Sequence, residues 1–134
     1  MKKKFSKNWK TSSQPRKKRK YVANAPLHIR RKFVSVNLSK DLRKKLEKRN
    51  LPIKKNDKVK IKRGKFKGKE GKILEVNLKK SKVIIEGIQV KKMDGSKANV
   101  KMQPSNLQII ELAERKNKKE SKKKNESESK KWVI

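Results

Sequence analysis

The sequence contains no cysteine and only one histidine, and these shortages exclude several kinds of site. Without cysteine the chain has no disulfide, no thiolate ligand and no thiol nucleophile. With His28 as its single imidazole, it cannot build a metal site from several histidines. Its acidic residues between positions 51 and 112 stand among lysines, where they are better explained as local charge partners than as catalytic pairs. We therefore expect a protein that is not an enzyme and that uses no metal and no cofactor.

Hydrophobic residues are also scarce, at 31% of the 134 residues, while 43% are charged. This is too little apolar material for one core along the whole chain, so we expect a compact unit of about half its length. No apolar run approaches the ~20 residues that span a membrane, and the basic N-terminus lacks the apolar segment of a signal peptide. We expect a soluble intracellular protein with no membrane partner.

Positive charge, in contrast, is abundant. Lys and Arg number 45 against 12 Asp and Glu, and the resulting formal charge of +33 predicts a polyanionic partner. The net charge is +17 in residues 1–50, +11 in residues 51–112 and +5 in residues 113–134. We assign these three ranges to a basic N-terminal arm with one short helix, a globular domain, and a charged low-complexity C-terminal tail.

The first twenty residues hold ten basic side chains and no acid, and no helical or strand period organises them. The run Ser-Ser-Gln-Pro at positions 12–15 interrupts any helix there. We expect this segment to be disordered until it enters an anionic groove. A nuclear-import signal or a solvated tail is the simpler alternative. The arm residues that we assign to phosphate binding are Arg16, Lys17, Lys18, Arg19 and Lys20.

The stretch from Asp57 to Val76 organises the rest of the chain. Val59 and Ile61 alternate with lysines, as in a strand with one buried face and one cationic face. Three glycines interrupt this pattern in residues 63–71, and a second apolar run follows at once. The pattern predicts a hairpin whose positively charged tip can approach phosphate closely. The tip residues that we assign to binding are Arg63, Lys65, Phe66, Lys67 and Lys69.

Further strands are predicted at residues 82–88, 97–102 and 107–112, with a hairpin turn at Asp94-Gly95. Five or six short strands in fewer than sixty residues, with no long helix between them, predict a small antiparallel barrel or sandwich.

Two helical segments are predicted before these strands. Residues 38–49 form the one clear helix, with Ser39 as its N-cap. Pro26 suits the first position of a shorter helical turn, which Asn24 helps to cap. The turn is expected to leave three basic side chains outside the core, and these are Arg30, Arg31 and Lys32.

Nucleic acid is the polyanion that fits these features. Phe66, Tyr21 and Trp9 could stack on exposed bases, whereas Phe66 could equally close one end of the domain as a hydrophobic plug. Aromatic residues make up only 4% of the chain, so stacking on many successive bases is not the main mechanism. Recognition by charge and shape fits structured RNA better than single strands.

Residues 59–73, VKIKRGKFKGKEGKI, resemble a KOW motif in their spaced glycines and flanking strands. Four further segments resemble one family that carries this motif, and they occur in the order found in that family. They are Gln14–Lys17, Asn24–Lys32, Leu38–Lys44 and Pro104–Asn106. Together they resemble the universal large-subunit ribosomal protein twenty-four family in its archaeal and eukaryotic branch, over residues 14–112. Gln103 stands where relatives commonly have histidine.

The resemblance implies an SH3-like barrel. With the strand pattern, it predicts a mainly β fold whose small antiparallel barrel we assign to residues 51–112, and composition predicts that the basic extensions are disordered when free. The resemblance further implies a cytoplasmic structural constituent of the large ribosomal subunit that binds rRNA near the exit of the peptide tunnel and contributes to early subunit assembly. Its partners would be large-subunit rRNA and neighbouring large-subunit ribosomal proteins, without a homo-oligomer. The resemblance also points to the tip residues named above and to His28, Arg30, Arg31 and Lys32.

Two alternatives remain open from the sequence. One is a KOW-domain RNA-binding transcription or translation factor, and the other is a cationic RNA chaperone. A membrane-active cationic peptide is disfavoured, because it would need a longer apolar face than Leu38, Leu42 and Leu46 provide.

Overall fold

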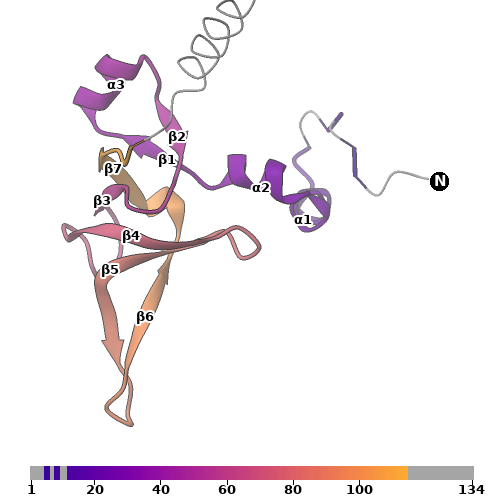
Figure 1. Ribbon diagram of the computed structural model, residues 1–134. Coiled ribbons are helices and arrows are strands. Elements are labelled where there is room, and N and C mark those ends of the chain that lie inside the picture. The colour runs from indigo at the N-terminus through magenta and orange to yellow at the C-terminus, as the bar shows by residue number, and fades with distance from the viewer. Residues whose placement is uncertain (1–4, 7, 10–11, 115–134) are drawn as a thin grey trace, which may run out of the picture.

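The computed structural model describes residues 5–6, 8–9 and 12–114 (Figure 1). In these residues the chain forms three α-helices, seven strands and one 3-10 helix, which confirms the prediction of a mainly β protein. Most of the predicted C-terminal tail, from residue 115 onward and including Trp132, lies outside the described residues. The arm residues Lys2, Lys3, Lys4, Lys7 and Lys10 lie outside them as well.

All seven strands belong to one sheet in the order β2-β1-β7-β3-β4-β5-β6. The strands are β1 (Ser35–Leu38), β2 (Asn50–Pro52), β3 (Lys58–Ile61), β4 (Glu70–Asn77), β5 (Lys82–Lys91), β6 (Lys97–Met102) and β7 (Leu107–Glu111). Neighbouring strands are antiparallel except β1 and β7, which run parallel, so the sheet is mixed. The fold is consistent with a small SH3-like barrel that stays open, because β2 and β6 are the two edges of the sheet.

Alternating apolar side chains build the core. Val59 and Ile61 of β3 are fully buried, as the two-residue period predicted. Ile73 of β4, Ile85 of β5 and Ile109 of β7 are buried with them in one hydrophobic cluster. This core holds the strands of the sheet together, and the charged loops extend from the ends of these strands.

One charged residue is part of this packed interior. Asp57 is buried, and its carboxylate accepts hydrogen bonds from the backbone N–H groups of Lys54 (2.8 Å) and Ala113 (2.9 Å). Asp57 therefore joins the segment before β3 to the end of β7. Glu111, in contrast, is a local charge partner of the kind the sequence predicted, since it pairs with Lys58 at 3.0 Å and raises the pKa of that lysine through the hydrogen bond.

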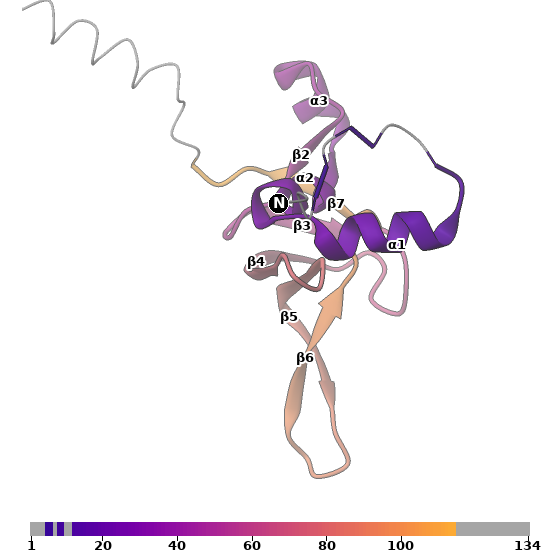
Figure 2. The same cartoon turned by 90° about the vertical axis from the view of Figure 1, so that its right-hand side faces the viewer.

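Strands β5 and β6 form a hairpin that projects away from the helices (Figures 1 and 2). Its turn confirms the predicted Asp94-Gly95 signal, because Gly95 has φ +83° and the Asp94 carboxylate accepts hydrogen bonds from both the backbone N–H and the hydroxyl of Ser96. The register between β5 and β6 shifts between Ile84 and Gln89, and this irregularity separates the core end of the hairpin from its projecting end.

Helix α3 (Lys40–Leu46) is the helix predicted at residues 38–49, but it is shorter. Ser39 is its N-cap, as predicted, and accepts a hydrogen bond from the backbone N–H of Leu42 at 3.4 Å. Leu38 belongs to β1 instead, and Glu47 adopts the left-handed conformation at φ 51°, which ends the helix. The sequence pattern did not reveal the two short strands that flank this helix.

Helix α1 (Pro15–Asn24) corrects the expectation that Pro15 and its neighbours interrupt any helix in the arm. Proline is tolerated in the first turn of a helix, because the N–H that it lacks has no intrahelical acceptor there. Ala25 and Pro26 separate α1 from α2 (Leu27–Phe33), and Pro26 is the N-cap residue of α2. Asn24 makes no side-chain cap for α2, contrary to the prediction, because it is the last residue of α1.

Candidate nucleic-acid interface

The β3–β4 loop, residues 62–69, is held in one shape by backbone hydrogen bonds. Ile61 N donates to the carbonyl of Lys69 (2.9 Å), and Gly68 N donates to the carbonyl of Ile61 (2.8 Å). Gly64 has φ +98° and Gly68 has φ +87°, values that a residue with a Cβ rarely adopts. The predicted hairpin is therefore present, and its tip is ordered by its own backbone.

The cationic side chains of the β3–β4 loop are exposed, and none of them pairs with an acid in the part of the chain that the structure describes. Among the described residues the ion pairs are Lys58–Glu111 and Lys60–Glu70, so the nearest acid, Glu70, is already paired with a lysine of β3 at 3.2 Å. Lys65, Lys67 and Lys69 remain available for an external anion. An ordered loop with three ammonium groups that form no ion pair with a described residue is suited to binding successive phosphates.

Phe66 lies on the inner side of the same loop. Its side chain is partly buried and packs against the hydrophobic core, which agrees with the role of a plug at one end of the sheet. Lys69 Nζ lies 5.6 Å from the centre of the Phe66 ring, within the range of a cation–π contact. Phe66 thus supports the loop, and its packing leaves less of the ring for stacking on a base.

Arg30 was predicted to lie outside the core, but the structure shows its guanidinium hydrogen-bonded to the protein backbone. Its guanidinium donates hydrogen bonds to the carbonyl oxygens of Ala25 (3.0 Å), Ala23 (2.7 Å) and Lys79 (2.7 Å). Arg30 therefore ties the junction of α1 and α2 to the turn between β4 and β5. The other predicted residues of α2, His28, Arg31 and Lys32, are exposed.

The predicted arm residues lie on helix α1, where all five side chains are exposed; they are Arg16, Lys17, Lys18, Arg19 and Lys20. Lys18 and Arg19 line a shallow cavity together with Arg30 and Lys79, so the structure brings this part of the arm to the β4–β5 turn. It does not bring α1 to the β3–β4 loop. The basic residues of α1 and those of the β3–β4 loop form two cationic groups, which adjoin opposite ends of β4. Because β4 has eight residues, its ends lie about 25 Å apart.

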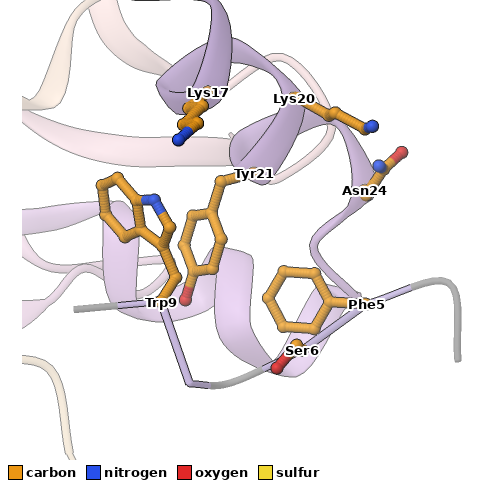
Figure 3. A pocket seen from close by; sticks show the side chains of 7 residues that line it. All are labelled: Phe5, Ser6, Trp9, Lys17, Lys20, Tyr21 and Asn24. Atoms are coloured by element: carbon orange, nitrogen blue, oxygen red, sulfur yellow. The ribbon is translucent and has the colours of Figure 1, made fainter. Parts of the chain in front are cut away.

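The aromatic residues of the arm stack on one another rather than standing free for bases. The Trp9 and Tyr21 rings lie 4.7 Å apart and nearly parallel, and Phe5 and Phe33 lie 5.0 and 5.8 Å from Tyr21. Figure 3 shows Trp9 and Phe5 on either side of Tyr21, beneath Lys17 and Lys20 of α1. This cluster packs the N-terminal segment against α1 and α2, which explains why α1 has an anchored position although none of its residues is fully buried.

Arg30→Lys is expected to loosen the two N-terminal helices. A lysine cannot make the three hydrogen bonds of the guanidinium in this geometry, and we expect the docking of residues 15–33 to weaken by about 2 kcal/mol. Amide hydrogen exchange should become faster in α1 and α2 while β3 to β7 stay protected. Arg31→Lys, an equal change at the exposed neighbour, is the control. Equal exchange rates in the two variants would contradict the role of Arg30.

The described residues contain no group of three or more His, Cys, Asp or Glu side chains that could hold a metal ion. Within the same part of the chain, no helix is long and apolar enough to cross a membrane.

The chain matches a known protein family over most of its length. The family model, described as the ribosomal proteins L26 of eukaryotes and their archaeal counterparts of the L24 type, matches residues 12–125. The matched range contains all the helices and strands of the structure and every residue assigned above to RNA binding. It also extends beyond Leu112, where the resemblance drawn from the sequence motifs ended.

Proposed function

Because the chain belongs to the family of eukaryotic L26 and archaeal L24-type ribosomal proteins, we propose that it binds the rRNA of the large subunit through its β3–β4 loop and its N-terminal helices. The observation that carries this proposal is the loop itself. Lys65, Lys67 and Lys69 are exposed on a tip fixed by backbone hydrogen bonds, and the adjoining Glu70 is paired with Lys60. Such a tip binds phosphates without losing the conformational entropy that a disordered loop would lose on binding.

The N-terminal helices provide the second contact. Arg16, Lys17 and Arg19 of α1 are exposed, as are Arg31 and Lys32 of α2, and none of these five has an acidic partner among the described residues. Arg30 positions this group by tying it to the β4–β5 turn. A protein that holds two cationic groups at the two ends of one strand bridges two stretches of RNA backbone, which suits folded rRNA better than a single strand.

Membership of this family also supports a proposal about where the contact lies in the ribosome. We propose that the protein lies near the exit of the peptide tunnel in cytoplasmic ribosomes, contacts neighbouring large-subunit proteins, and helps to fold rRNA early in subunit assembly. The open sheet acts as a rigid mount in this role, and release of counterions from the rRNA supplies much of the affinity.

Sedimentation of cell extract through sucrose gradients tests the proposed function. A structural constituent should be present at one copy per large subunit and should remain there as the salt concentration of the gradient is raised. A KOW-domain transcription or translation factor would be substoichiometric and would leave the ribosome in moderate salt. A free RNA chaperone would sediment without a fixed stoichiometry. Either of the last two results would contradict the proposal.

A further inference from the structure

A cleft at the base of the β3–β4 loop has the composition of a second RNA contact. It encloses about 230 Å³ and is lined by residues from β1, α3, the β3–β4 loop, the segment that leads into β7, and β7 itself. The lining residues are Asn37, Arg43, Lys62, Arg63, Ser105, Leu107 and Gln108. Three of them are cationic and none is acidic, so the cleft is built for an anion.

Backbone contacts fix the walls of this cleft. Arg43 donates a hydrogen bond from Nε to the carbonyl oxygen of Leu38 at 2.9 Å, and the side-chain amide of Gln108 donates to the same oxygen at 3.4 Å. Lys62, which also lines the cleft, donates a hydrogen bond from its backbone N to the carbonyl oxygen of Asn106 at 2.8 Å. The bond at Nε orients the guanidinium of Arg43, and its two terminal amino groups, which donate to no described residue, can bind a ligand.

The lining also explains which anion fits. A guanidinium binds phosphate with two parallel hydrogen bonds, and the ammonium of Lys62 adds a point charge. The hydroxyl of Ser105 and the amide of Asn37 can each donate and accept, which a ribose 2′-hydroxyl requires. A volume of about 230 Å³ is below the range of about 300 to 1,000 Å³ found for drug-sized ligands, so the site suits one backbone unit rather than a whole nucleotide cofactor.

We propose that this cleft binds one phosphate and ribose unit of an RNA backbone, held by Arg43, Lys62 and Arg63. This inference rests on the proposed function, because the RNA strand concerned is the one that contacts the β3–β4 loop. Arg63 belongs to both the loop and the cleft, so the two sites are continuous. The interface thereby extends from the loop to helix α3, whose Arg43 the sequence pattern did not single out.

The test compares three variants of the full chain in binding to purified large-subunit rRNA. Arg43→Gln is expected to weaken binding about tenfold through the loss of its charged hydrogen bonds. Lys62→Gln is expected to weaken binding about fivefold and keeps the backbone bond from Lys62 N to Asn106, so it separates binding from folding. Lys45→Gln, an equal loss of charge at an exposed position of the same helix, is the matched control and should cost no more than about twofold.

The outcomes separate the two levels of the proposal. If the unmodified chain binds rRNA and Arg43→Gln and Lys62→Gln both match Lys45→Gln, the cleft is not a contact and the proposed function stands. If the unmodified chain does not bind rRNA, both the proposed function and the cleft are overturned. If Arg43→Gln and Lys62→Gln each weaken binding well beyond the control, the cleft is the site that we propose.

Discussion

Replacing Lys65, Lys67 and Lys69 together by Gln is expected to weaken binding to large-subunit rRNA by about a hundredfold at physiological salt. The three ammonium groups are exposed on an ordered tip and have no acidic partner among the described residues, so each is free to displace a counterion from the RNA. The slope of log affinity against log salt concentration should therefore fall by up to about three. Titrations of the rRNA at several salt concentrations measure both quantities.

The control for this experiment removes the same charge from another part of the molecule. Lys91, Lys92 and Lys97 are exposed near the tip of the β5–β6 hairpin, which projects away from the helices (Figure 1). Their joint replacement by Gln lowers the net charge equally, and we expect a clearly smaller loss of affinity. A salt slope unchanged by the loop substitutions, or equal losses in the two triple variants, would remove the β3–β4 loop from the interface.

Gly71→Val is expected to destabilise the fold more than any other single change considered for this chain. A Cβ at Gly71 would lie 2.7 Å from the carbonyl oxygen of Glu86 and 2.8 Å from Cγ2 of Ile85. Gly71 pairs with Val59 of β3, so β4 cannot move away from β5 without breaking its pairing on the other side. We expect the free energy of unfolding to fall by about 3 kcal/mol or more, as measured by urea denaturation.

Lys72→Val provides the comparison, because it introduces the same side chain at the next, exposed position of β4. Its effect should stay within about 0.5 kcal/mol, as for most surface substitutions. The two values together test whether close approach of β4 and β5 at Gly71, rather than valine in β4 as such, is responsible. A Gly71→Val variant as stable as Lys72→Val would show that the strands can separate there at little cost.

The local features of this fold could be predicted from the sequence because their causes are local. The alternation at Val59 and Ile61 indicated β3, the glycines at 64 and 68 indicated the loop, and Asp94-Gly95 indicated the projecting hairpin. In each case the pattern and the structure that it produces lie within about ten residues.

The features that the sequence did not reveal depend on partners far along the chain. Strand β1 is in the sheet because it pairs in parallel with β7, about seventy residues later. Arg30 reaches the carbonyl of Lys79, and Arg43 lines a cleft with Ser105 and Gln108. No periodic pattern in the sequence indicates such contacts. From the sequence alone, an arginine that holds two helices in place cannot be distinguished from one that faces RNA. Helix α1 was missed for a related reason, since its anchor is the ring cluster around Tyr21 and not an apolar face.

The proposed function depends most on direct contact between the β3–β4 loop and large-subunit rRNA. A photo-crosslinking amino acid placed at position 67, at the exposed tip of the loop, tests this contact in purified large subunits. We predict a crosslink from position 67 to one defined stretch of large-subunit rRNA, and none to that stretch from the same group placed at Met93 on the β5–β6 hairpin. Crosslinks from position 67 to proteins alone, or to many unrelated RNA sites, would contradict the account.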